Sequence, residues 1–337
     1  MYIIENYSTA VLFCVVTMLC WGSWANTQKL AAGRWRFELF YWDYTIGILL
    51  LSVLFALTLG STGSEGRAFW PDVQQANISA MGSALVGGIT FNLANILLVA
   101  AIAIAGMSVA FPVGIGIALI LGVIVNYAAR PAGNPASLFG GVALITLAIL
   151  LNARAYRRMA TAQSNQLATN APSRGLWLAV AAGLLMGFFY RFVAAGTVTN
   201  FTLPEAGKLS PYSALVLFAV GIFISNLLFN TLLMRWPFVG EPLPIKAYFT
   251  GSLRNHLTGL LGGAIWCIGM LLNIVASDKA SPAVAYGLGQ GATVVAALWG
   301  IYVWKEFREA PAGTYWLLNT MLLCYIAGLM LLILTKL

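Results

Sequence analysis

Ten apolar runs, each about as long as a helix that crosses a lipid bilayer, occupy most of this 337-residue sequence. They lie at 8–26, 42–60, 79–104, 107–128, 136–152, 174–195, 211–234, 254–276, 281–303 and 312–335. Only 8% of the residues are charged and 60% are hydrophobic, so the chain cannot cover an ordinary water-soluble domain with charge. The sequence therefore predicts an all-α integral membrane protein with ten transmembrane helices. It disfavours nucleic-acid binding, soluble catalysis and secretion.

Basic residues are unevenly divided between the two sides of a ten-helix protein. One side holds twelve: Lys29, Arg34, Arg36, Arg154, Arg157, Arg158, Arg174, Arg235, Lys246, Arg254, Lys305 and Arg308. The other side holds six: Arg67, Arg130, Arg191, Lys208, Lys279 and Lys336. Because cytoplasmic loops carry the excess of Lys and Arg, the sequence predicts a multi-pass protein of the cell (inner or plasma) membrane with both termini outside.

The two halves of the sequence are related by a shift of 175 residues. Nine residues of the first half recur identically under this shift: Gly87, Gly88, Leu97, Ala101, Ala105, Val109, Ala110, Gly114 and Gly116. Phe91 and Phe111 correspond to two other aromatic residues, Trp266 and Tyr286. Because each half holds five helices, an odd number, the second half must insert upside down. The sequence thus predicts a 5+5 inverted repeat.

The repeats are separated by the longest polar break. We place the first five-helix repeat at 1–152, a basic cytoplasmic linker at 153–173 and the second repeat at 174–337. Inverted repeats are typical of secondary transporters, which bind their solute near the midplane between the halves.

Glycines recur at equivalent points of the two halves: Gly114, Gly116, Gly287, Gly289 and Gly291. We interpret them as hinge positions, where glycine permits flexible or unwound backbone close to a ligand. Close packing of helices is the alternative explanation.

Two charged residues lie in or beside the apolar runs, where an uncompensated charge is costly. Asp43 stands where the second helix is predicted to begin; it could bind a proton in a cavity, or pair with Arg34 or Arg36 at the interface. Arg191, toward the end of the sixth run, could extend to the interface, or reach Asp43 or a polar solute. Asp43 and Arg191 are the candidate coupling residues.

Neutral amides and aromatic residues inside the runs are the candidate solute-binding residues: Trp21, Trp24, Asn26, Phe91, Asn92, Asn95, Asn226, Trp266, Tyr286 and Gln290. An amide both donates and accepts hydrogen bonds, and an aromatic face suits a sugar ring or a planar heterocycle. Packing or lipid contact is the alternative for each aromatic residue. Because His256 is the only histidine and the acidic residues are scattered, the sequence predicts no metal site, no catalytic residue and no cofactor.

Several of these residues belong to motifs of a known family. The motifs are Cys20 to Asn26 with Trp21, Gly22, Ser23 and Trp24, then Trp42, Asp43 and Tyr44, then Gly87 and Gly88 through Asn95, then Gly106, Met107 and Ser108. They resemble the ureide permease and glucose/ribose porter branch of the drug/metabolite transporter superfamily, as does the opening Met1, Tyr2, Ile3, Ile4 and Glu5. Sugar porters of the superfamily share the Trp21 to Trp24 pattern.

The resemblance implies a 5+5 inverted-repeat bundle whose central cavity is lined by helices one to four and six to nine. It also implies alternating access and, in many members, proton-coupled uptake. The acid that small multidrug exporters carry in their first helix has no counterpart in residues 8–26.

Together these features favour a secondary active transporter that takes up a small neutral polar solute: a sugar, a ureide, or a nucleoside or nucleobase. Protons, or alternatively sodium, would be the coupling ion, and either a monomer or a homodimer would suffice. Export of drugs or metabolites is the alternative. A membrane enzyme is disfavoured because such enzymes need clustered acidic residues or histidines.

Overall fold

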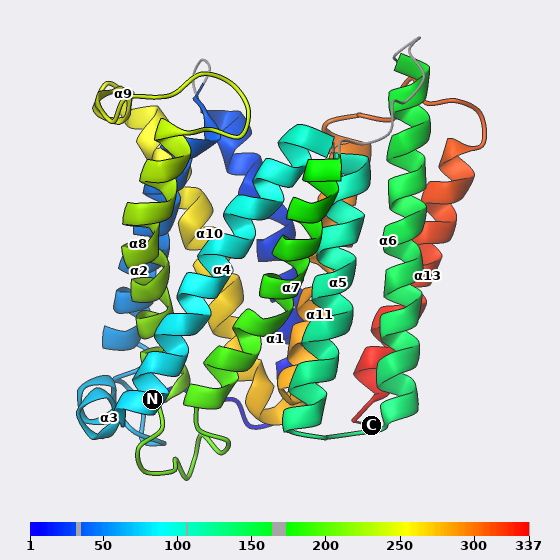
Figure 1. Ribbon diagram of the computed structural model, residues 1–337. Coiled ribbons are helices and arrows are strands. Elements are labelled where there is room, and N and C mark those ends of the chain that lie inside the picture. Colours follow the sequence, from blue (N-terminus) through cyan, green and yellow to red (C-terminus); the bar gives the residue numbers. More distant parts are fainter. Residues whose placement is uncertain (32–34, 106, 164–172, 337) are drawn as a thin grey trace.

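The predicted spans are long helices that run side by side between two polar ends (Figure 1). The computed structural model describes residues 1–31, 35–105, 107–163 and 173–336. Within these residues, ten helical segments are long and apolar enough to cross a membrane, so the predicted all-helical fold with ten spans is confirmed. Arg34, Gly106 and residues 164–172, which entered the sequence predictions, lie outside the described residues.

Each half contributes five spans. The first half comprises α1 (Tyr7–Ser23) with its continuation η1 (Trp24–Leu30), α2 (Phe37–Leu57), α4 (Ile78–Ala105), α5 (Met107–Ala129) and α6 (Pro135–Gln163). The second half comprises α7 (Ser173–Gly196), α8 (Pro211–Arg235), α10 (Leu253–Ala280), a ninth span made of α11 (Pro282–Gly289), α12 (Ala292–Leu298) and η2 (Trp299–Val303), and α13 (Thr314–Leu334). Two short helices, α3 (Phe69–Gln75) and α9 (Lys246–Phe249), lie in loops.

Polar residues just outside the apolar runs cap several of these helices. The side chains of Asn6, Ser210 and Ser252 accept hydrogen bonds from backbone N–H groups in the first turns of α1, α8 and α10. Such caps satisfy N–H groups that have no partner inside the helix. Pro211, which follows Ser210, occupies the first turn, where its missing N–H is not needed.

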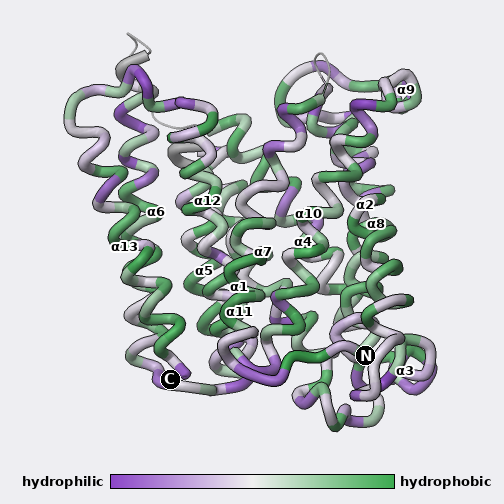
Figure 2. Tube along the Cα trace, turned by 180° about the vertical axis from the view of Figure 1, so that it is seen from behind, coloured by the Kyte–Doolittle hydropathy of each residue, from purple (hydrophilic) through white to green (hydrophobic). Residues whose placement is uncertain are grey.

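The bundle has two distinct ends. Both termini and α3 lie at one of them, the terminus end; α9 and the end of α6 lie at the other, the linker end (Figure 1). Hydrophobic residues fill the height between the ends, and hydrophilic residues gather at both (Figure 2). Exposed tryptophans, Trp70 near the terminus end and Trp177 and Trp236 near the linker end, flank the apolar zone as membrane-interface aromatics do.

Matched glycine contacts show that the halves are related as an inverted repeat. A Cβ added to Gly88 of α4 would clash with the carbonyl oxygen of Phe218 on α8. A Cβ added to Gly263 of α10, the equivalent glycine, would clash in the same way with the carbonyl oxygen of Tyr44 on α2. The third helix of each half therefore packs backbone to backbone against the second helix of the other half, which interlocks the two.

Three local features differ from the sequence expectations. Helix α2 begins at Phe37 rather than near residue 42, so Asp43 lies inside the helix and not at its start; Glu38 stabilises this earlier start, since an acidic side chain is favourable in a first turn. Helix α6 continues through residues 153–163 of the predicted linker, a stretch rich in Ala and Arg, which favour helix.

The third difference concerns the glycines interpreted as hinges. Helix α5 runs without interruption through Gly114 and Gly116. The ninth span is instead broken between α11 and α12, after Gly289 and at Gly291. The two halves therefore differ in conformation at equivalent positions.

We expect Gly88→Ala to lower the thermal midpoint of the detergent-purified protein. The added methyl group must displace the α8 backbone, and overpacking of this kind typically costs about 1–3 kcal/mol. Gly82→Ala in the same helix is the matched control, because nothing lies within 4 Å of its added Cβ. That variant should be neutral or slightly stabilised, by up to about 1 kcal/mol, since alanine favours helix over glycine. Equal thermal midpoints for the two variants would contradict the packing described.

Candidate functional site

Two residues that the repeat makes equivalent meet between the halves. Phe91 lies near the middle of α4 and Trp266 near the middle of α10, and their ring centroids are 4.5 Å apart. Both side chains are buried. Contact between equivalent residues is the geometry expected where a pseudo-twofold axis crosses the molecule.

Further aromatic rings surround this pair. We call the set the central aromatic cluster: Trp21, Phe91, Phe189, Phe218, Trp266 and Tyr286. The ring of Trp266 stacks with Trp21 and with Phe218, at 5.9 Å between centroids in each case. The cluster thus joins six helices, α1, α4, α7, α8, α10 and α11, near the middle of the bundle.

The structure brings together four of the predicted aromatic residues but not the fifth. Trp24 packs instead against Tyr44, at 4.5 Å between centroids. Phe189 and Phe218 were missed by the sequence analysis. The sequence repeat could have pointed to Phe218. A shift of 174 residues aligns Gly47 with Gly221, and it aligns the aromatic residue Tyr44 with Phe218.

Polar atoms without partners lie beside the cluster. The indole Nε1 of Trp21 and the amide Oδ1 of Asn273 are buried and have no hydrogen-bond partner among the described residues. Both side chains adjoin Gly289, where an added Cβ would contact them. A buried donor or acceptor without a partner costs roughly 1–3 kcal/mol. This donor and this acceptor lie on side chains next to stacked rings and are each free to bind a polar group.

The predicted amides Asn92 and Asn95 belong to a satisfied network. Tyr41 donates from its hydroxyl to Asn92 Oδ1 (2.9 Å) and accepts from Asn95 Nδ2 (3.0 Å), while Asn92 Nδ2 donates to Ser225 (2.9 Å). The third predicted amide, Asn226, donates to Thr45 between α8 and α2, and its Oδ1 has no partner among the described residues. These contacts link α2, α4 and α8 close to the central aromatic cluster.

A small cavity of about 150 Å³ lies near the linker end, between α1, α5, α6 and α12. Five of its lining residues form what we call the linker-end network: Asn26, Lys29, Tyr156, Trp304 and Glu306. Glu306 pairs with Lys29 (3.5 Å) and accepts from the Tyr156 hydroxyl (2.9 Å), and Trp304 donates to Asn26 Oδ1 (2.7 Å). The network therefore ties the end of the first span to α6 and to the loop after η2.

The remaining predicted amide, Gln290, is buried at the break between α11 and α12.

A larger cavity of about 500 Å³ lies at the terminus end, which we call the terminus-end cavity. It opens between the ends of α5, α7 and α10, the start of α11 and the α7–α8 loop. Arg191 lines it, whereas Asp43 contacts Tyr248 of α9, which lies at the linker end. The structure thus separates the two residues predicted as a coupling pair.

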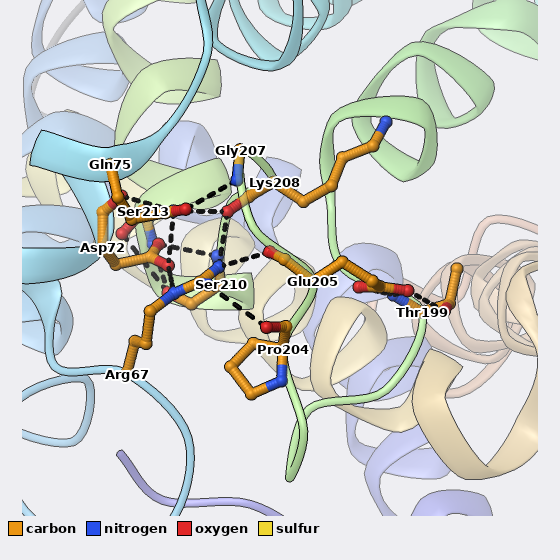
Figure 3. Close-up of polar contacts among 10 residues, drawn as sticks. All are labelled: Arg67, Asp72, Gln75, Thr199, Pro204, Glu205, Gly207, Lys208, Ser210 and Ser213. Atoms are coloured by element: carbon orange, nitrogen blue, oxygen red, sulfur yellow. Dashed lines mark hydrogen bonds and ion pairs between the residues drawn. The ribbon is translucent and has the colours of Figure 1, made fainter.

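Charged residues beside this cavity hold the α7–α8 loop in place (Figure 3). Asp72 is fully buried and accepts from Arg67 Nε (2.9 Å) and from the backbone N–H of Ser210 (2.6 Å). Arg67 also donates to three backbone carbonyls of the loop. Partial burial acts to raise the pKa of Glu205, but hydrogen bonds from Thr199 outweigh it and hold that pKa below its ordinary value.

Asp43 has partners that the sequence analysis did not foresee. Its Oδ2 lies 2.9 Å from His256 Nδ1, and its Oδ1 accepts from the Tyr248 hydroxyl (2.6 Å). Arg36 pairs with Glu38 instead, so the expected alternative of an Asp43–Arg36 pair is wrong. Burial and then the neighbouring Asp43 raise the pKa of Tyr248 above its usual range. Asp43 is only 2% exposed, and its contact with His256 holds it at the start of α10.

Comparisons with known proteins agree with this architecture. The family model described as ureide permease matches residues 40–174 and 168–335. Ureide permease 1 of Arabidopsis thaliana is 28% identical over 97% of both chains, and Ureide permease 2 of the same plant is 25% identical over 97% of both. A crystal structure with 14% sequence identity superimposes with a TM-score of 0.59 over 97% of this chain and 96% of that chain, which shows a shared fold.

Proposed function

The chain belongs to the ureide permease family of membrane transporters, and we propose that it takes up a small neutral polar solute by alternating access. Among the solutes considered, which are ureides, sugars, and nucleosides or nucleobases, we favour a ureide or a similar planar heterocycle. We further propose that uptake is coupled to protons. The protein is a transporter and not an enzyme.

The observation that carries this proposal is the central aromatic cluster with its two unpartnered polar atoms. A planar ring would stack on Trp21 or Trp266, as aromatic rings in proteins prefer offset stacking. Its C=O would accept from Trp21 Nε1 and its N–H would donate to Asn273 Oδ1. These partners are neutral, and a neutral site favours a neutral solute because an unpaired buried charge is costly.

The two cavities support alternating access. They lie toward opposite ends of the bundle, on either side of the central aromatic cluster, and the linker-end one is small and crossed by an ion pair and hydrogen bonds. The small volume of the linker-end cavity and the contacts across it favour a conformation that is closed at this point. With the linker end cytoplasmic, as the excess of Lys and Arg there favours, this would be an outward-facing state.

The solute is tested with purified protein in proteoliposomes. We expect uptake of allantoin, a neutral ureide, to exceed that of glucose and uridine. Trp266→Ala should lower this uptake about tenfold through loss of stacking, and Trp266→Phe should retain most of it. Trp236→Ala is the matched control, since this tryptophan is 63% exposed at the linker end. Absence of uptake in all three solute classes, with efflux of lipophilic cations, would replace uptake by export.

The linker-end network is tested through the accessibility of the cavity behind it. In protein whose four native cysteines are replaced, Asn152→Cys places one thiol in the cavity lining. Adding Glu306→Gln removes the ion pair with Lys29, so a membrane-impermeant maleimide should react several-fold faster from the linker end. Glu309→Gln, in the same loop but exposed, should leave the rate unchanged. Equal rates for both variants would show that the network does not close this end.

Proton coupling is tested at Asp43. Its carboxyl, paired with His256 and Tyr248, can exchange a proton near the linker end, whereas Glu38, the other buried acid of the second span, pairs with Arg36. We expect Asp43→Asn to abolish accumulation driven by a pH gradient while solute exchange across the membrane persists. Glu38→Gln, in the same helix, should keep both activities. Undiminished gradient-driven accumulation in Asp43→Asn would exclude this role.

A further inference from the structure

The terminus-end cavity carries an excess of positive charge that the central solute site does not use. Arg130, Arg191 and Lys208 line it, against a single carboxylate, Glu205. Both oxygens of Glu205 accept hydrogen bonds from the backbone N–H of Thr199, and one also accepts from its hydroxyl. The acid is therefore engaged within its own loop and forms no ion pair with these cations among the described residues.

The three cations line the cavity without an ion pair to a carboxylate among the described residues, although the charge of Arg130 helps to lower the pKa of Glu205. Arg130 donates to the carbonyl oxygen of Thr199 (3.0 Å) and Lys208 to that of Ala195 (2.5 Å), and both acceptors are neutral. Arg191 is half-buried, and in the part of the chain that the structure describes it has no hydrogen bond or ion pair. A guanidinium presents several N–H donors in a plane that matches a carboxylate, and partial desolvation strengthens such a pair.

A second, independent observation comes from Asn126 on α5. Its side chain is 1% exposed and lines the same cavity. The Nδ2 group donates to the carbonyl oxygen of Gly122 (2.8 Å), while Oδ1 is buried and has no partner among the described residues. The cavity therefore offers a buried acceptor as well as free positive charge, so a bare inorganic anion would satisfy only half of it.

We propose that the terminus-end cavity binds a small organic monoanion that carries both a carboxylate and an N–H donor. The carboxylate pairs with Arg191, supported by Arg130 and Lys208, and the N–H group donates to Asn126 Oδ1. A volume of about 500 Å³ is in the usual range for small-molecule sites and exceeds what a simple ion needs. The site is separate from the central aromatic cluster, and it does not depend on which solute is transported.

The test uses a matched pair of probes: ureidoacetate, a monoanion with ureido N–H groups, and hydantoin, its neutral ring-closed form. Isothermal titration of the full chain in neutral detergent should show ureidoacetate binding that weakens as salt is added, because exposed charge pairs are screened. Arg191→Gln should weaken it at least tenfold, and Arg191→Lys should restore part of the affinity. Asn126→Leu should also weaken it, because this variant removes the Oδ1 acceptor for the N–H group.

Two controls make the outcome decisive. Arg254→Gln, at the linker end, should leave ureidoacetate binding unchanged, and hydantoin binding should respond to Trp266→Ala but not to Arg191→Gln. Absence of ureidoacetate binding, or equal affinity in wild type and Arg191→Gln, overturns the anion site while leaving the proposed transport function intact. If the wild-type protein neither binds hydantoin nor takes up allantoin, the result would instead count against the proposed transport function.

A phospholipid headgroup is the other source of an anion at this end of the bundle. The titration is therefore repeated in nanodiscs of phosphatidylcholine alone and of phosphatidylcholine with phosphatidylglycerol. Equal ureidoacetate affinity in both supports a site for a free solute. Loss of binding only with phosphatidylglycerol, relieved by Arg191→Gln, would assign the positive charge to lipid and overturn the proposal.

Discussion

The fold depends on two close approaches of backbone, between Gly88 and Phe218 and between Gly263 and Tyr44. At each, the absence of a side chain lets a helix of one half lie directly on a helix of the other. In a bilayer, where lipid solvates apolar side chains as well as protein does, such tight packing is a main source of helix association. Because the aromatic side chains Phe91 and Trp266 follow these glycines by three residues in each half, the same contacts bring the two rings together.

The chemistry of the molecule changes along its height. Its middle holds stacked rings, amides and hydroxyls, whereas its charged side chains are gathered toward the ends (Figure 2). At the linker end, Lys29 and Glu306 neutralise each other across a small cavity. At the terminus end, Arg191 faces a larger cavity without a partner among the described residues. The positive charge of the terminus-end cavity and the neutral rings of the central aromatic cluster are therefore separated along the height of the bundle.

Much of the architecture was predictable because it rests on hydrophobic length and on an ungapped repeat. The ten spans, the upside-down second half and the equivalence of Phe91 with Trp266 all follow from those two patterns, whereas the contact between these two rings comes from the structure. The pairing of Asp43 with His256 and Tyr248 did not, since it joins α2 to residues more than two hundred positions later in a loop and a helix start. Such contacts depend on how loops fold over the bundle, which apolar periodicity does not encode.

The difference between the halves at their glycines bears on how the protein could move. An inverted repeat can face its two ends in turn if each half adopts the conformation of the other. Here the ninth span is broken near Gly289 while α5 is continuous through the equivalent Gly114. Exchange of conformations would straighten the ninth span and break α5. Pro112, inside α5, already removes one helical hydrogen bond near Gly114. The proposed transport cycle therefore requires the glycines of both halves, although the described conformation uses the break in only one.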